Sequence, residues 1–566
     1  MGDSYVIAID FGTAYSGYAF NITARDEESD PILKRWGAKH GLDTPKTPTC
    51  ILFDQDEKFL SFGYEAKTTY IKMRGEEAKK HYFFQGFKMA LQGTDLNRNL
   101  KIKAANNKEM EALEVFSESL RFLKDDALET INAKTRTKLT PSDFTWVLTV
   151  PTIWEFSAKQ FMKKAAMKAG IIKKGDDKKL VMALEPEAAS IWCKKLPADG
   201  FISEKHNTES LDQTAGTRYI IVDCGGGTMD ITVHEVLEGG ALKELIKTSG
   251  NNMGGQNVDR KLKKFLKEIF SDGVWDEYKK NYPSEVQKMM YDFTYLKQVD
   301  EDVEITCPYN LGKLARKKKS IEKFFESVDG ASWNEGYIKI SQEKLRSFFD
   351  ESLQGITKSL REIKKDLNIG FILLVGGFAE SQILRQHINE QFGEEYKILC
   401  PVRPQEAILR GAVEFGRNPK IVAFQRSRFT YGVAVLRRFD ESEHKQEKKI
   451  TADGKEWCQD IFKILLEEGE GVGWDETREH VLTAVDPKQT QMSVRLFRSK
   501  MKNPRYVDDW GVKDVGSFTV KLCDPERNKE RKVKVELKFG SPEITATGTD
   551  LSTGEKGSLK SEFKTL

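Results

Sequence analysis

The sequence lacks several features that would place it in particular protein classes. No apolar run approaches the roughly 18 residues that a membrane helix requires, and the start shows no basic region followed by an apolar secretory segment. The seven cysteines are scattered, with no Cys-x-x-Cys pair and no nearby histidine to complete a zinc site. We therefore expect a cytoplasmic chain with reduced thiols and no membrane span.

An excess of charge of one sign is also missing. Lys and Arg number 90 against 87 Asp and Glu, a formal net charge of +3. Such a balance gives no global field of the kind that marks a nucleic-acid-binding protein, so we expect no nucleic acid partner. At 566 residues the chain can bury several cores, and its length predicts about three or four compact units.

The stretch "YVIAIDFGTAYSGYAF", residues 5–20, is an apolar run that stops at Asp10, turns at Gly12-Thr13 and resumes. One interpretation is a structural turn, because Asp bonds its own backbone and Gly tolerates positive φ. The other is chemical: the strand end directs Asp10 into a cleft, and the turn presents backbone N–H groups to an anion.

The second interpretation is favoured by a repeat. "RYIIVDCGGGTMDITVHEV", from Arg218, has the same design: an apolar strand, Asp223, a glycine turn and an alternating strand. Two copies in one chain are difficult to ascribe to turn propensity. Two such hairpins could hold a polyphosphate between them, with N–H groups on its oxygens and the two aspartates on the waters of Mg²⁺. The chain has no G-x-x-x-x-G-K-[ST] match, which excludes P-loop chemistry.

A third element follows both hairpins. "GFILLVGGFAESQILRQHI", from Gly370, predicts a buried strand, the pair Gly376-Gly377, and a helix that begins near Ala379 or Glu380. Such a junction lets a flat ligand lie close to the backbone. The order is phosphate loop, phosphate loop, adenosine loop.

This order resembles the actin, sugar-kinase and heat-shock ATPase superfamily. Three stretches narrow the resemblance to the heat shock 70 kDa chaperones: "TVPTIWEFSAKQFMKKAAMKAGI" from Thr149, "ALEPEAASIW" from Ala183 and "MGGQNVDRKL" from Met253. "IDFGTAYSGYAF" and "YFFQGFKMAL" are most similar to the divergent heat shock 70 kDa protein 12 branch. The resemblance implies an actin-like, two-lobed α/β ATPase fold with duplicated ribonuclease-H-like subdomains over residues 1–416.

The resemblance also implies roles for single residues. Asp10 and Asp223 would hold the waters of Mg²⁺, and Lys88, Glu185, Asp223 and Thr13 would be catalytic. The contacts to ATP or ADP would come from Gly12, Thr13, Ala14, Tyr15, Gly225, Gly226, Gly227, Thr228, Gly254, Gly255, Gly376, Gly377 and Glu380. From the residues alone, Glu185 beside Pro186 could equally be a charge at a helix N-terminus, and Lys88 a lysine of an amphipathic helix.

Three departures from the family pattern predict weaker or slower nucleotide handling. Phe378, Ala379 and Glu380 stand where the family usually has Ser-Thr-Arg, so an acid replaces the arginine that would stack on adenine. Ala14 replaces a hydroxyl residue of the first hairpin. Gln256 and Asn257 replace acids after the Gly-Gly turn. Glu380 could instead be an acid in the first turn of the following helix.

The pattern changes after residue 416. Residues 417–428 read as a short basic-apolar linker, and alternating strands such as "FTYGVAV", "MSVRLFRS" and "KVKVELKF" follow. "VELKFGSPEITATGTDLSTGEKGSL", from Val535, resembles the last strands of the family's peptide-binding β-sandwich, with turns near Gly540 and at Ser552-Thr553-Gly554. A generic β domain is the alternative. We expect residues 429–566 to form a β-rich substrate-binding-like domain without the helical lid.

Three functions remain in competition. The leading hypothesis is an ATP-binding, chaperone-like protein that hydrolyses ATP slowly with Mg²⁺ and couples nucleotide state to a protein or peptide client. The second is a nucleotide-gated interaction scaffold with negligible turnover, which Ala14 and Glu380 favour. The third is a sugar-kinase-like transferase, but the sequence shows no clear sugar pocket with a carboxylate base.

Overall fold

The computed structural model describes residues 5–23, 29–93, 99–202, 210–247, 253–363, 367–452, 454–473, 476–485, 489–522, 531–540 and 543–559. The chain divides into two compact units. The first comprises Met1–Gly240 with Lys247–Ile421, and the second comprises Ala241–Ile246 with Val422–Leu566. The range 417–428, predicted as a linker, contains the strand β20 (Val422–Arg426), whose first residue is buried.

The first predicted hairpin forms the centre of one sheet in the first unit. Strands β1 (Tyr5–Phe11) and β2 (Tyr15–Asn21) are antiparallel, and β1 runs parallel to β10 (Phe144–Val150). The order is β11-β10-β1-β2-β3, with β11 (Leu180–Leu184) and β3 (Ile32–Leu33) at its ends and β4 (Thr47–Pro48) also paired to β2. Residues 6–9 are fully buried, as expected of a strand covered on both faces.

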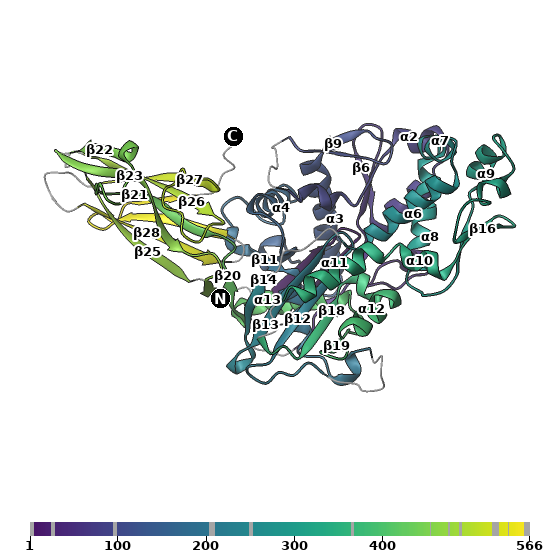
Figure 1. Cartoon of the computed structure of the whole chain (residues 1–566), viewed down its shortest axis with the longest axis horizontal. Coiled ribbons are helices and arrows are strands. Elements are labelled where there is room, and N and C mark those ends of the chain that lie inside the picture. Colours follow the sequence, from purple (N-terminus) through teal and green to yellow (C-terminus); the bar gives the residue numbers. More distant parts are fainter. Residues whose placement is uncertain are drawn as a thin grey trace. The chain divides into compact units, whose positions relative to one another are not determined.

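The second hairpin repeats this design. Strands β12 (Arg218–Cys224) and β13 (Met229–Val236) are antiparallel, while β12 runs parallel to β18 (Phe371–Val375) and β18 runs parallel to β19 (Lys397–Leu399). Figure 1 shows these strands with α11 (Asp350–Arg361) and α12 (Gln382–Phe392), which contact β13 and β19 respectively. The predicted duplication of strand, hairpin and parallel neighbour is confirmed.

Two helices connect the two sheets. Helix α13 (Glu406–Arg417) packs on β1, β2 and β10, and α5 (Glu185–Cys193) contacts strands of both sheets. The helices touch at Gly411, where an added Cβ would lie 1.6 Å from the carbonyl oxygen of Ala188. A glycine is therefore required for this backbone approach, which sets the position of Glu185 at the start of α5.

Further helices and small sheets complete the first unit. The other helices are α1 (Gly63–Lys72), α2 (Glu76–Lys80), α3 (Ala112–Asn132), α4 (Phe156–Lys168), α6 (Gln256–Ile269), α7 (Val274–Asn281), α8 (Pro283–Leu296), α9 (Tyr309–Arg316) and α10 (Gln342–Ser347). The small sheets pair β5 (Cys50–Phe53) with β6 (Phe59–Phe62) and β7 (Tyr82–Gln85), β8 (Lys101–Lys103) with β9 (Glu109–Glu111), and β17 (Tyr337–Ile340) with β15 (Val303–Thr306) and β16 (Ala331–Asn334). This mixed α/β architecture is consistent with the actin-like ATPase fold.

The second unit is built from strands. One sheet has the order β22-β23-β21-β26-β27 and another has the order β25-β28-β29-β30. Their bounds are β21 (Thr430–Arg438), β22 (Lys449–Ala452), β23 (Lys455–Leu466), β25 (Thr477–Thr483), β26 (Gln491–Ser499), β27 (Val512–Lys521), β28 (Lys532–Gly540), β29 (Glu543–Asp550) and β30 (Lys556–Leu559). Strands β14 (Leu242–Lys247) and β20 pair in parallel, and β24 (Gly471–Gly473) pairs with β20. The three strands predicted from alternation are confirmed.

One hydrophobic core joins these two sheets. Val494 and Val520 of the first sheet cluster with Val535 and Leu537 of the second. The predicted turn at Ser552-Thr553-Gly554 is present between the paired strands β29 and β30, and Gly540 pairs with Glu543 across β28 and β29. Residues 541–542 and 560–566, on which part of the turn and lid predictions falls, lie outside the described residues.

Among the helices of the described residues, none combines the length and the apolar composition needed to cross a membrane.

Candidate functional site

A cavity of about 710 Å³ in the first unit brings the predicted site residues together. The predicted residues that line it are Asp10, Gly12, Thr13, Ala14, Tyr15, Lys88, Glu185, Asp223, Gly225, Gly226, Gly227, Thr228, Gly255, Gly376, Gly377 and Glu380. Gly254 is not a lining residue: it packs behind the second hairpin, where an added Cβ would lie 2.7 Å from the backbone of Gly226.

The turns of the two hairpins contact each other. A Cβ on Gly226 would lie 2.6 Å from the Cβ of Ala14, and one on Gly227 would lie 2.8 Å from the Thr13 hydroxyl oxygen. Within the first turn, a Cβ on Gly12 would lie 2.2 Å from the carbonyl oxygen of Tyr15. The predicted requirement that both hairpins lie within reach of one polyphosphate is therefore met.

Asp10 is the penultimate residue of β1 and has two polar partners, one for each of its carboxylate oxygens. The Thr149 hydroxyl, near the end of the parallel neighbour β10, donates to Oδ1 at 2.7 Å. The ammonium of Lys46 forms a buried ion pair with Oδ2. Burial raises the pKa of Asp10, but the charges of Lys46 and Lys88 act in the opposite direction and leave this pKa below its ordinary value.

Lys88 and Glu185 form a second buried ion pair. The Lys88 Nζ donates to Glu185 Oε1 at 2.8 Å, and the ammonium lies 5.0 Å from the ring centroid of Trp154. Lys88 follows β7 in a short 3₁₀ turn (Phe87–Leu91), so the amphipathic-helix alternative does not describe it. Glu185 is the first residue of α5, but its carboxylate is directed to the cavity rather than serving only the helix dipole.

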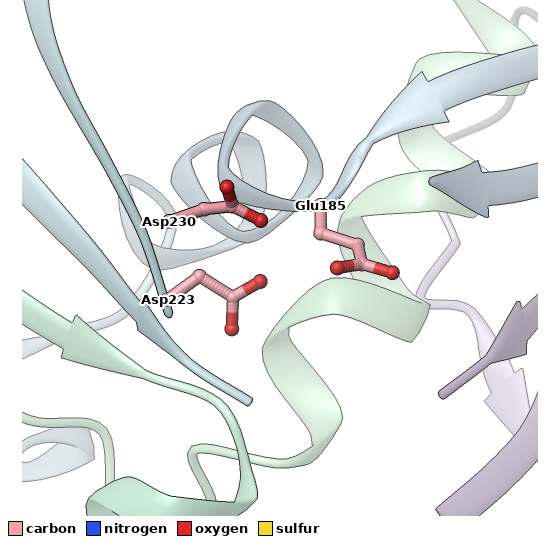
Figure 2. A group of neighbouring side chains, drawn as sticks. All are labelled: Glu185, Asp223 and Asp230. Atoms are coloured by element: carbon pink, nitrogen blue, oxygen red, sulfur yellow. The ribbon is translucent and has the colours of Figure 1, made fainter. Parts of the chain in front are cut away.

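Glu185 also belongs to a group of three buried carboxylates, two of which line the cavity. One oxygen each of Glu185, Asp223 and Asp230 can be chosen so that all lie within 4.8 Å of one another. Figure 2 shows these side chains turned toward one another from the start of α5 and from β12 and β13. Asp223 and Asp230 are direct partners in the hairpin register, which explains why both reach the same place.

The proximity of these acids perturbs their titration. Burial, followed by the charges of Glu185, Asp230 and Asp10, raises the pKa of Asp223 well above its ordinary value. Burial also raises the pKa of Glu185, against the opposing charge of Lys88. Among the described residues, Asp223 Oδ1 has no hydrogen-bond partner although it is buried. Such an unsatisfied buried carboxylate oxygen is costly unless a cation or ligand satisfies it.

The Mg²⁺ that the sequence predicts has a suitable donor set at this trio. Clustered carboxylate oxygens are the ligands that hard cations prefer, and the Asp223 oxygen without a partner points to the same conclusion. Asp10, predicted as the other metal residue, differs because Thr149 and Lys46 already engage its oxygens.

The Gly-Gly turn before α6 supports the second hairpin directly. The N–H of Gly255 donates to the carbonyl of Gly225 at 3.1 Å, and the N–H of Gln256 donates to that of Gly226 at 2.8 Å. Gly376 approaches from the other side with φ at 86°, and a Cβ there would lie 2.6 Å from Asp223 Oδ1. The backbone of Gly255 and Gln256 on one side and Gly376 on the other thus fix the position of the second hairpin.

The predicted helix start near Ala379 or Glu380 is wrong by two or three residues. Residues Gly377–Glu380 form a 3₁₀ turn, and α12 begins at Gln382 after Ser381. The positive φ of Gly376 turns the chain tightly, and Arg385 donates to the carbonyls of Ala379 and Glu380 at 3.0 and 2.7 Å. Glu380 therefore precedes the helix instead of lying in its first turn.

The side chain of Glu380 belongs to the cavity. It is partly buried, lines the cavity, and its carboxylate accepts a hydrogen bond from the side chain of Gln405. Burial raises its pKa, while the nearby charge of Lys46 lowers it by a smaller amount. An acid thus stands where the resemblance places an arginine.

Sequence reasoning missed several lining or supporting residues. Asp230 lies in the quoted repeat, where the alternating pattern predicts only a strand residue; its position opposite Asp223 in the hairpin register is the signal that identifies it. Thr149 lies at the start of a quoted family stretch. Tyr291 and Tyr295 of α8 line the cavity as a perpendicular ring pair 5.5 Å apart. Lys46 lies in "TPKTPT", which carries no chemical signal of its own.

Comparison with known proteins gives a consistent assignment. The family description "Hsp70 protein" matches residues 6–416. The chain is 32% identical to human heat shock 70 kDa protein 12A and 31% identical to human heat shock 70 kDa protein 12B, each alignment covering 99% of this chain and 91% of the relative. It is 25% identical to the chaperone protein DnaK of Mycoplasmopsis synoviae (strain 53), over 61% of this chain and 51% of that protein.

Proposed function

Because the chain belongs to the Hsp70 protein family, whose members bind ATP and ADP, typically with Mg²⁺, we propose that it binds these nucleotides in the cavity of its first unit. We further propose that it hydrolyses ATP slowly and couples its nucleotide state to the binding of a protein or peptide. The observation that carries the proposal is the contact between the two glycine hairpins beside four buried carboxylates and two buried lysines.

We assign the phosphates and the adenosine of the nucleotide to different loops of the cavity. N–H groups of residues 12–15 and 226–228 bind the phosphate oxygens, because glycine allows the backbone to approach them closely. The N–H of Gly225 instead closes the second turn by donating to the carbonyl of Thr228 at 3.0 Å, so Gly225 contributes by leaving space for the phosphate. Gly376 and Gly377 lie along the adenosine. Gly254 acts only through the second hairpin, against which it packs.

Hydrolysis requires a water molecule in line with the γ-phosphorus. Glu185 and Asp223 orient this water, whose oxygen bonds to phosphorus while the bond to the β–γ bridging oxygen breaks. Lys88 lies beside Glu185 and offsets charge that develops on the transferred group. Asp223, with Asp230 and Glu185, would hold Mg²⁺, which neutralises charge on the phosphate oxygens when it is bound.

A second candidate is a nucleotide-gated scaffold that binds ATP or ADP with negligible turnover. Ala14 favours it, because this position contributes only a methyl group at the contact with Gly226 and offers no hydroxyl to a phosphate. Glu380 also favours the scaffold. This acid lines the cavity where the family usually has an arginine, so no guanidinium at this position can stack on the adenine. Both features reduce the interactions available to a reacting nucleotide.

The two candidates are separated by measuring turnover and affinity on the same full-length preparation. ADP affinity comes from titration calorimetry, and turnover comes from steady-state phosphate release with ATP and Mg²⁺. If the unmodified chain binds ADP and releases phosphate, and Asp223→Asn abolishes that release, the result supports the enzyme. If the unmodified chain binds ADP but releases phosphate no faster than Asp223→Asn does, the result supports the scaffold. If the unmodified chain does not bind ADP, both candidates are contradicted.

For the second unit we propose a β-sandwich that contacts the client, spanning residues 429–566 and lacking a helical lid. The range 417–428 before it, predicted as a linker, contains β20 and is therefore not proposed as a free linker. Support comes from its two sheets with one shared core and from the resemblance of the last three strands to the family's peptide-binding domain. The test is fluorescence anisotropy of an unfolded peptide with the full chain in ATP and in ADP. Equal anisotropy of the peptide with and without protein would contradict this assignment.

A further inference from the structure

Lys46 is a buried lysine that lines the cavity. Its side chain is only 7% exposed, and its ammonium pairs with Asp10. The stem passes Gly17, the register partner of Asp10, where an added Cβ would lie 3.1 Å from Lys46 Cγ. Gly17 therefore leaves room for the lysine beside the first hairpin.

The backbone around Lys46 is also held in place. The Thr44 hydroxyl donates to the carbonyl of Lys46 at 2.8 Å. On the other side, Thr49 donates its hydroxyl to the carbonyl of Gly12 at 2.8 Å. The segment that carries the ammonium is thus attached to the phosphate turn itself, so Lys46 has little freedom to leave the cavity.

The electrostatic surroundings explain why an ammonium can be buried here. Lys46 acts electrostatically on Asp10, Glu185, Asp223 and Glu380, lowering the pKa of each. Removing an ammonium from water is costly unless opposite charges and hydrogen bonds compensate it. The four acids that interact with Lys46 supply that compensation. Without the lysine, the same carboxylates would attract a divalent cation.

We propose that the ammonium of Lys46 is a resident cation, which takes the place of a divalent metal beside Asp10 and makes nucleotide binding in this cavity largely independent of Mg²⁺. The inference rests on the proposed nucleotide binding. An ammonium has positive charge and three donors for phosphate oxygens, but it is covalently part of the chain. The trio of Glu185, Asp223 and Asp230 remains available to a metal for hydrolysis.

The first test needs no variant. ADP is titrated into the unmodified full chain by calorimetry, once in EDTA and once in excess Mg²⁺. We expect the two dissociation constants to agree within about threefold, a small difference on the scale of one charged hydrogen bond. A loss of affinity of about tenfold or more in EDTA overturns the proposal.

The second test removes the charge and keeps the apolar stem. Lys46→Met should weaken ADP binding by about tenfold or more in EDTA, and Mg²⁺ should restore most of the loss. The matched control is Lys39→Met, which removes an exposed lysine paired with Glu65 at 2.9 Å and should leave both affinities unchanged. A Lys46→Met protein that binds ADP equally well with and without Mg²⁺ overturns the proposal.

A third measurement does not use nucleotide. Mn²⁺ is titrated into the nucleotide-free proteins and bound metal is read by electron paramagnetic resonance. Lys46→Met should bind Mn²⁺ about tenfold more tightly than the unmodified chain or better, because one positive charge has left the cluster of acids. If neither the unmodified chain nor Lys46→Met binds ADP, the proposed nucleotide binding fails, and the Mn²⁺ titration alone tests the role of Lys46. Equal Mn²⁺ affinities of the two proteins would contradict the proposal that the Lys46 ammonium acts as a resident cation.

Discussion

Asp223→Asn should stabilise the first unit while it removes a group that we assign to ATP hydrolysis. The perturbation takes one charge from a buried trio whose oxygens lie within 4.8 Å of one another. Two unit charges at that separation repel by about 3.5 kcal/mol when the effective dielectric constant is about 20. Lys46 and Lys88 offset part of this repulsion, so we expect a net gain in unfolding free energy of about 1 to 3 kcal/mol at neutral pH.

The sign of the pH dependence follows from the raised pKa of Asp223 in the folded state. The unfolded chain releases this proton near pH 3.8, while the folded chain retains it to higher pH. The native state therefore loses stability as pH rises from the unfolded to the folded pKa, by up to about 1.4 kcal/mol per pH unit. The advantage of Asp223→Asn should be small near pH 4 and should grow over that interval.

The assay is thermal or denaturant unfolding of both proteins in EDTA, followed from pH 4 to pH 8. The control is Asp43→Asn, which removes an exposed carboxylate paired with Arg35 and should leave the midpoint nearly unchanged. A variant that is less stable than the unmodified chain at neutral pH, or a gain that does not depend on pH, would refute the assignment of Asp223 to a repulsive buried cluster.

Three further outcomes are expected. If ATP is hydrolysed, Asp10→Asn and Asp223→Asn should each lower steady-state phosphate release by about 10² to 10³, and unchanged release would remove them from the mechanism. Glu380→Arg should tighten ADP binding in calorimetry by about three- to thirtyfold, because a guanidinium can stack on adenine; equal or weaker binding would falsify the stacking hypothesis. Gly411→Ala should lower the unfolding free energy by more than about 2 kcal/mol, since its Cβ would meet the Ala188 carbonyl at 1.6 Å, and an unchanged denaturation midpoint would contradict the close packing of α5 on α13.

The two hairpins could be predicted because their signals are local. Burial on both faces of β1 and β12 requires continuous apolar residues, so Asp10 and Asp223 stand out as polar breaks in each run. The glycine turns then specify the close backbone approach, and repetition of the whole pattern distinguishes chemistry from turn propensity. The same logic located the third loop at Gly376.

Other parts of the site depend on tertiary structure and left no comparable pattern. Lys46 follows a Thr-Pro pair in a polar connection, and only the folded chain brings its ammonium to Asp10. The α8 tyrosines have ordinary helical spacing, which is equally typical of core residues. The helix after Gly376 starts later than predicted because a 3₁₀ turn intervenes, and helix ends are set by such local hydrogen bonds rather than by periodicity.

Nucleotide binding between the two hairpins is tested most directly by ADP calorimetry on a pair of glycine variants of the full chain. Gly226→Ala places a methyl group 2.6 Å from the Cβ of Ala14 and must displace the phosphate turns, whereas Gly370→Ala meets no atom within 4 Å. We predict that Gly226→Ala weakens ADP binding by about tenfold or more, while Gly370→Ala binds as the unmodified chain does. Equal ADP affinities of all three proteins, or no binding by the unmodified chain, would contradict the assignment of this cavity as a nucleotide site.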